Sequence, residues 1–170
     1  MQRRDFITAG ALAACGASLA GGAWAQSGYP ARPVRMVVPF PPGGPTDVMG
    51  RTAAKAMGER LGQQFVVENK AGAGGNIGTD FVAKAAPDGY TIGLAAISSL
   101  AIAPHLYASL PFNVEKDLLP ISLVGTTPCA LVIHPGAPFS DLAGMVAHAK
   151  ANPGRLSYAT SGIGTSNHLA

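Results

Sequence analysis

Strand-like and helix-like segments alternate along the first half of this chain, and this alternation restricts the possible folds more than any other feature. Residues 34–40 form a β-branched apolar run, and residues 46–61 carry apolar side chains at helical spacing. Residues 65–67 are again strand-like, residues 79–86 fit a short helix, and residues 90–96 fit a buried strand. Because strands separated by helices favour a parallel sheet, the predicted fold class is α/β.

The second half shows the same alternation after a segment rich in loop signals, residues 104–120. Residues 121–125, 130–134 and 156–159 are strand-like, and residues 141–151 fit a helix. We therefore expect the chain to change from one lobe to another within the loop-rich segment.

Composition favours a folded chain without a nucleic-acid partner. Hydrophobic residues make up 48% of the chain and charged residues only 12%, so enough apolar surface can be buried to offset the ordering entropy. The net charge of +3 has no basic cluster behind it, since no two Lys or Arg residues are adjacent beyond Arg3 and Arg4. A surface that follows a phosphate backbone is therefore not predicted.

Residues 1–25 fit an export signal and are set apart from the fold. Two arginines precede an apolar run at residues 6–20, and a small-x-small cleavage site ends at Ala25. This pattern predicts a periplasmic protein whose mature chain begins at Gln26.

Two alternatives concern the export route. Arg3 and Arg4, followed by Asp5 and Phe6, resemble a twin-arginine signal, whereas an ordinary Sec signal can also contain two arginines. The tetrapeptide that ends at Cys15 resembles a lipobox, and lipid anchoring there is a minor alternative. The sequence leaves both questions open.

Three loops rich in glycine or hydroxyl residues follow predicted strands, at residues 39–47, 69–78 and 160–168. In open α/β sheets, ligands bind beyond the carboxyl ends of the strands. Glycine lets the backbone approach a ligand closely, and the free N–H groups of a helix start favour an anion. The three loops together predict a shared small anionic ligand. The alternative for each loop is purely structural: its glycines only make turns, and Asp47 only caps a helix or pairs with Arg51.

Enzyme signatures are largely absent. The Gly72-Ala73-Gly74 run has Ile77 where the dinucleotide fingerprint needs glycine, and no Gly-Lys-Ser/Thr loop is present. The histidines lack metal-ligand spacing, and no serine lies in Gly-x-Ser-x-Gly. Cys129 lies in an apolar run and is expected to be a small buried hydrophobe. No metal, cofactor or catalysis is predicted, and the alternative is a hydrolase that uses Ser161 and His168.

Four motifs, in order along the chain, closely resemble the Bug family. They are YPARPVRMVVPFPPGGPTD at residues 29–47, VENKAGAGGNIG at 67–78, AAPDGYT at 85–91 and SGIGTSNHLA at 161–170. Members of this family are the solute-binding receptors of tripartite tricarboxylate transporters. The resemblance implies a periplasmic-binding-protein type II-like, two-lobed fold that closes on a small carboxylate, with the transporter's membrane components as partners.

The resemblance also implies the binding site. In such receptors the first two loops hold a carboxylate through backbone groups and bridging waters, and the third loop offers hydroxyls and N–H groups from the other lobe. Pro41 stands where relatives often have a small residue. Carried over by position, the ligand-binding residues are Phe40, Pro42, Gly43, Asp47, Gly74, Gly75, Asn76, Ser98, Ser99, Ser161, Thr165 and Ser166.

Receptors of this family are close to twice as long, so we expect an incomplete fold. The expected organisation is an export signal at residues 1–25, the first lobe at 26–103, and a crossover with the beginning of a truncated second lobe at 104–170. A helix start near Thr165 with no helix after it agrees with this expectation. A non-functional fragment is therefore a further alternative, and the isolated chain is expected to expose apolar surface.

Overall fold

The computed structural model describes residues 28–170. The predicted export signal, its cleavage site and the alternatives at Arg3, Arg4 and Cys15 lie outside the described residues. All contacts discussed below lie within residues 32–170, which form one unit.

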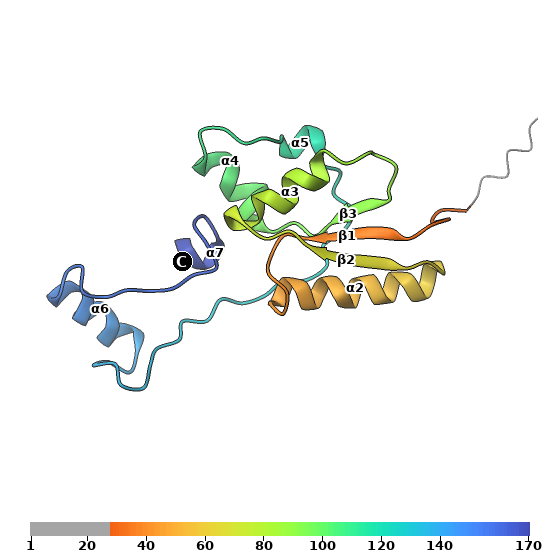
Figure 1. The fold of residues 1–170 in the computed structure, drawn as a ribbon. Coiled ribbons are helices and arrows are strands. Elements are labelled where there is room, and N and C mark those ends of the chain that lie inside the picture. The colour runs from red at the N-terminus through yellow and green to blue at the C-terminus, as the bar shows by residue number, and fades with distance from the viewer. Residues whose placement is uncertain (1–27) are drawn as a thin grey trace, which may run out of the picture. The chain divides into compact units, whose positions relative to one another are not determined.

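A three-stranded parallel sheet is the centre of this unit (Figure 1). Strand β1, Val34–Val38, lies between β2, Phe65–Asn69, and β3, Thr91–Gly93. The parallel arrangement predicted from the alternation of strands and helices is confirmed. Strand β3 is shorter than predicted.

Two helices cover opposite faces of the sheet (Figure 1). Side chains alternate between the faces of a strand. Met36 and Val38 of β1 face α2, Pro45–Leu61, where a Cβ built at Gly50 would lie 2.7 Å from Val38 Cγ2. On the other face, a Cβ at Gly93 would lie 2.7 Å from Val82 Cγ2 of α3, Asn76–Ala83. Both helices therefore pack closely on the sheet.

Local sequence explains the ends of α2. Pro45 occupies the first turn, where its missing N–H group costs no hydrogen bond. Gly62 ends the helix with a φ of 69°, a left-handed conformation that favours glycine, and its N–H donates to Gly58 O. The predicted helix is confirmed. Helix α3 starts three residues earlier than predicted, because the turn Ala73–Gly75 leads directly into it.

Shorter helices follow β3. A π-helical turn at Ser98–Ile102 runs into α4, Ala103–Leu106, and α5 is Val114–Asp117. Helix α6, Leu142–Ala151, confirms the predicted helix and is capped by Asp141, whose Oδ1 accepts a hydrogen bond from Gly144 N at 2.7 Å. The last helix, α7, is Ser166–Leu169. In the described part of the chain, no helix is long and apolar enough to cross a membrane.

Three predicted strands are wrong. Residues 121–125, 130–134 and 156–159 have no assigned strand or bridge. A strand exists only where a second strand completes its hydrogen-bond ladder, and among the described residues none pairs with these segments.

Candidate functional site

The first two predicted ligand loops begin at one edge of the sheet, whereas the third does not follow a strand in the described chain. Strands β1 and β2 are parallel, with Val38 opposite Asn69, so both end at the same edge. The loop after β1 leads into α2, and the loop after β2 leads through a tight turn into α3. This is the carboxyl edge at which α/β proteins bind ligands.

The first two loops pack against each other through glycine. A Cβ built at Gly75 would lie 3.3 Å from Phe40 Cζ, and one at Gly78 would lie 2.7 Å from Pro39 Cβ. Gly75 also has a φ of 100°, which side chains rarely adopt. Glycine at these positions therefore lets α3 start directly against the first loop.

Gly74 is the point where the second and third loops meet. Its carbonyl oxygen accepts a hydrogen bond from Ser98 Oγ at 2.7 Å. A Cβ at Gly74 would lie 3.0 Å from Ile163 O and 3.7 Å from Thr165 Cγ2. Thr165 is only 3% exposed, and its hydroxyl donates to Gly162 O at 2.6 Å. The structure thus brings Phe40, Gly74, Gly75, Ser98 and Thr165 together.

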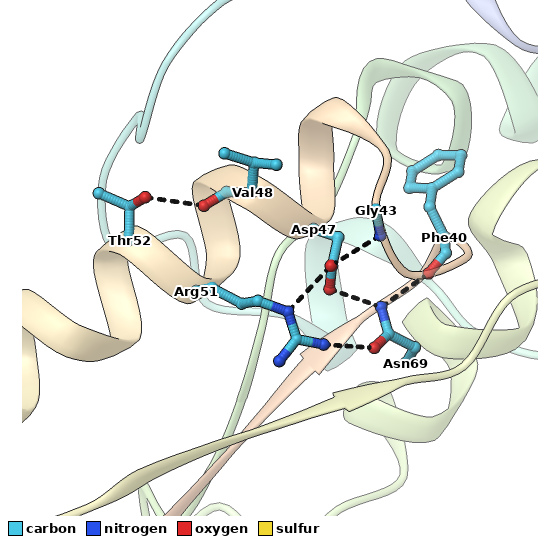
Figure 2. A network of polar contacts seen from close by, with 7 residues as sticks. All are labelled: Phe40, Gly43, Asp47, Val48, Arg51, Thr52 and Asn69. Atoms are coloured by element: carbon cyan, nitrogen blue, oxygen red, sulfur yellow. Dashed lines mark hydrogen bonds and ion pairs between the residues drawn. The ribbon is translucent and has the colours of Figure 1, made fainter.

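Asp47 holds the first loop to its helix and to β2 (Figure 2). Its Oδ2 accepts hydrogen bonds from Gly43 N and from Arg51 Nε, both at 2.9 Å. Its Oδ1 accepts from Asn69 Nδ2 at 2.8 Å. The predicted pairing of Asp47 with Arg51 is therefore confirmed, whereas the start of α2 has no side-chain cap, and Asp47 instead holds the preceding loop through Gly43 N.

These contacts set the ionisation of Asp47. The side chain is 3% exposed. The hydrogen bond from Arg51 has the largest effect on its pKa, followed by those from Gly43 and Asn69, and together they lower the pKa of this carboxyl well below its ordinary value. Asp47 is therefore an ionised carboxylate whose two oxygens accept hydrogen bonds from Gly43, Arg51 and Asn69.

Asn69 is a functional candidate that the sequence analysis did not single out. Its Nδ2 donates to Phe40 O at 3.0 Å as well as to Asp47, and its Oδ1 accepts from Arg51 Nη2 at 3.1 Å. The signal was available in the sequence: an amide side chain at the first position of a glycine-rich loop that follows a predicted strand.

Lys70 is the one basic side chain within the second predicted loop, and it is engaged elsewhere. Its Nζ lies 2.7 Å from Glu68 Oε1 and 4.2 Å from the centroid of the Phe81 ring. The Lys70 ammonium in turn lowers the pKa of Glu68 through a hydrogen bond. Its charge is therefore already balanced on the α3 face of the sheet.

The remaining predicted site residues differ in burial. Asn76 is 8% exposed, and its Oδ1 has no hydrogen-bond partner among the described residues. Ser99 is fully buried, and its hydroxyl donates to Ala96 O. Pro42, Ser161 and Ser166 are exposed. These residues are not joined by any hydrogen bond within the described part of the chain.

The residues of the hydrolase alternative have other partners. Ser161 Oγ donates to Asn167 Oδ1 at 2.9 Å, and His168 Nδ1 accepts from Gly164 N at 3.4 Å. A nucleophile and its base need a direct hydrogen bond, and none connects these two side chains. In residues 28–170, no group of His, Cys, Asp or Glu side chains could hold a metal.

Cys129 is exposed, so the expectation that it is buried is wrong. Its Sγ lies 3.9 Å from Ser166 Oγ. The apolar run around it has no strand partner in the described chain, which leaves the side chain open to solvent.

The sheet with its ligand loops has the fold of about half of a periplasmic binding protein. The solved periplasmic binding protein BugD is 40% identical, with a TM-score of 0.70 over 83% of this chain and 47% of that one. A protein of R. palustris solved with adipate is 33% identical, with a TM-score of 0.79 over the same shares. The α/β class and the binding-protein fold predicted from the sequence are confirmed.

The family follows from the sequence match. Residues 49–170 match the tripartite tricarboxylate transporter family receptor, and this chain belongs to that family. Protein BugT of Bordetella pertussis is 49% identical over 142 residues, which are 83% of this chain and 44% of BugT. The chain thus spans less than half the length of this relative.

Proposed function

We propose that this chain forms part of an extracytoplasmic receptor that captures a small carboxylate for a tripartite tricarboxylate-type transporter. Membership of the receptor family supports the role, and the solved relative with adipate supports a carboxylate ligand. The location would be the periplasm, and the partners would be the membrane components of the transporter. In this role the chain performs no catalysis.

The meeting of the second and third loops with Ser98 at Gly74 is the observation that carries the proposal. It brings the N-terminus of α3 next to Ser98 and to the buried Thr165 of the third loop. The first-turn N–H groups of an α-helix have no partner within the helix and favour an anion. A carboxylate at this junction would find N–H donors at the start of α3, while the hydroxyls of Ser98 and Thr165, which donate to Gly74 O and Gly162 O, hold the surrounding loops in place.

Uncharged groups would provide most of the recognition. The cations nearest the first two loops already have partners, because Arg51 pairs with Asp47 and Lys70 with Glu68. Oriented N–H groups can hold an anion without a counter-charge. Replacing Lys70 should therefore matter much less than disturbing the loops.

The test uses a chimera, since this chain spans 47% of the solved relative with adipate. Residues 28–170 replace the matching part of that relative, and isothermal titration calorimetry measures binding of adipate, malate, citrate, glutamate and benzoate. We expect saturable binding of at least one of these acids. A folded chimera that binds none of them would refute the proposal.

Two variants test the mode of recognition in the chimera. Thr165→Val keeps the shape of a buried side chain but removes its hydroxyl, and should weaken binding by about tenfold. Lys70→Ala should change the affinity by less than about twofold. Loss of all binding in Lys70→Ala would show that a charge governs recognition. Turnover of a model ester would support the hydrolase alternative, and no turnover is expected.

A further inference from the structure

The side chain of Asn69 reaches both Phe40 of the first loop and Asp47 and Arg51 of α2 (Figure 2). We propose that Asn69 is a positioning residue that fixes the first ligand loop against the second one, and so prepares the carboxylate site before a ligand arrives. The inference rests on the proposed function. It concerns a residue that lies outside the predicted set of ligand-binding residues.

The amide of Asn69 supplies both donors and an acceptor at this position. An asparagine side chain has two N–H donors and a carbonyl acceptor. Here the Nδ2 group donates to Phe40 O at 3.0 Å and to Asp47 Oδ1 at 2.8 Å, while Oδ1 accepts from Arg51. Aspartate has no such donors, and leucine has neither donors nor an acceptor, so neither can replace it.

The backbone that carries the Asn69 side chain is held rigidly in the sheet. Asn69 is the last residue of β2 and pairs with Val38 of β1, and the following amide, Lys70 N, donates to Val38 O at 2.9 Å. The side chain therefore extends from a fixed strand end. A short side chain on a rigid element positions its partners more precisely than one on a loop.

The two residues that accept hydrogen bonds from Asn69, Phe40 and Asp47, determine the conformation of the first loop. Phe40 carries the ring that packs beside Gly75 at the start of α3. Asp47 accepts the N–H of Gly43, whose φ of 84° places it in a sharp bend of the first loop. By holding Phe40 O and Asp47 together, Asn69 fixes both ends of this loop relative to the second loop.

The competing explanation is that Asn69 only adds to the global stability of the sheet. The two explanations differ in where protection from amide hydrogen exchange is lost. A positioning residue protects the loop, so its removal exposes Gly43 N, whose acceptor is Asp47 Oδ2. A residue of global importance protects all amides, including Val34 N, which donates to Gln64 O at 2.8 Å.

The first experiment measures exchange in the 170-residue chain. In Asn69→Leu and in Asn69→Asp we expect Gly43 N to exchange about tenfold faster than in the wild type, and Val34 N to exchange at an unchanged rate. Thr52→Val is the matched control, because Thr52 lies on α2, the helix that carries Asp47, and its hydroxyl donates to Val48 O instead of to the first loop. Unchanged exchange at Gly43, or an equal increase at Gly43 and Val34, would overturn the proposal.

The second experiment measures affinity in the chimera, with whichever tested acid the unmodified chimera binds best. Asn69→Leu should weaken its binding by about tenfold, and Thr52→Val by less than about twofold. Unchanged affinity in Asn69→Leu would overturn the positioning role. An unmodified chimera that binds no acid would instead contradict the proposed function, while hydrogen exchange still decides whether Asn69 holds the loop.

Discussion

Strand β1 and the segment at residues 119–132 both contain apolar, β-branched side chains, but these side chains have opposite environments. Val34 and Val37 in β1 are fully buried, whereas Leu119 is 90% exposed and Val132 is 84% exposed. Strand β1 has a neighbour on each side and a helix on each face, and the segment at residues 119–132 has no paired strand in the described chain. An apolar run therefore becomes a core strand only when other elements supply its ladder and its cover.

The largest expected effect comes from placing a charge in each region. Val37→Asp would bury an unpaired carboxylate between the sheet and α3 and should cost at least about 3 kcal/mol of unfolding free energy. Val132→Asp should change it by less than about 0.5 kcal/mol, because the side chain is already solvated. Urea denaturation followed by circular dichroism measures both, and equal effects would show that the two regions do not differ.

The next largest loss of stability is expected from a substitution at the close contact between α3 and the first loop. Gly78→Ala would place a Cβ 2.7 Å from Pro39 Cβ and 2.9 Å from Lys70 O. We expect a loss of about 1–3 kcal/mol, since backbone atoms cannot easily move aside. Gly44→Ala is the control, with a φ of −80° and its nearest contact at 3.7 Å, and in the same denaturation experiment it should cost less than about 1 kcal/mol, the usual effect of alanine at a helix N-cap. A neutral Gly78→Ala would mean that this packing is loose.

A smaller effect is expected in the stability that ionised Asp47 contributes, which depends on pH. Because the pKa of Asp47 is lowered by folding, its stabilising contribution is fully present above the ordinary carboxyl pKa of about 3.9 and is lost as the pH falls below it. Wild type should therefore be more stable than Asp47→Asn at pH 6, and the difference should shrink between pH 4 and pH 2. Thermal melts across this range measure it. A difference independent of pH would argue against an ionised Asp47 in this network.

The smallest effect on stability is expected in the exposed segment, where a dye reports the difference instead. Exposed apolar surface binds 8-anilinonaphthalene-1-sulfonate, and the chain should bind it at neutral pH. Replacing Ile121, Leu123 and Val132 together by serine should reduce dye fluorescence by about half or more without lowering the urea midpoint. Val48→Ser, at an isolated exposed position on α2, is the control. Unchanged fluorescence in the triple variant would place the dye elsewhere.

Several elements could be predicted from local sequence alone. The apolar run that becomes β1, the helical spacing of α2 and the glycine that ends it are properties of neighbouring residues. The parallel sheet followed from their order, and the family resemblance followed from four motifs. Local patterns succeeded there because β1 and α2 pack against partners that are close in sequence.

The sequence also identified the loops that meet at the site, but not how they are held. Gly74 and Thr165 were predicted site residues, and the tertiary structure decided that they lie side by side. The tertiary structure also decided that Asn69 and Arg51 both donate hydrogen bonds to Asp47, and that Lys70 forms an ion pair with Glu68. Hydrogen bonds between distant residues depend on the angle and register of whole elements, which no local pattern encodes.

The three predicted strands beyond residue 120 also separate what the sequence determines from what the tertiary structure decides. Their sequences carry the apolar and β-branched character of strands, and that character is a local property. Whether it produces a strand depends on a partner at hydrogen-bonding distance, and the tertiary structure of residues 28–170 pairs none with them. Sequence determined which segments could become strands. Pairing decided that, within residues 28–170, only β1, β2 and β3 did, because a ladder's hydrogen bonds belong to two strands and never to one.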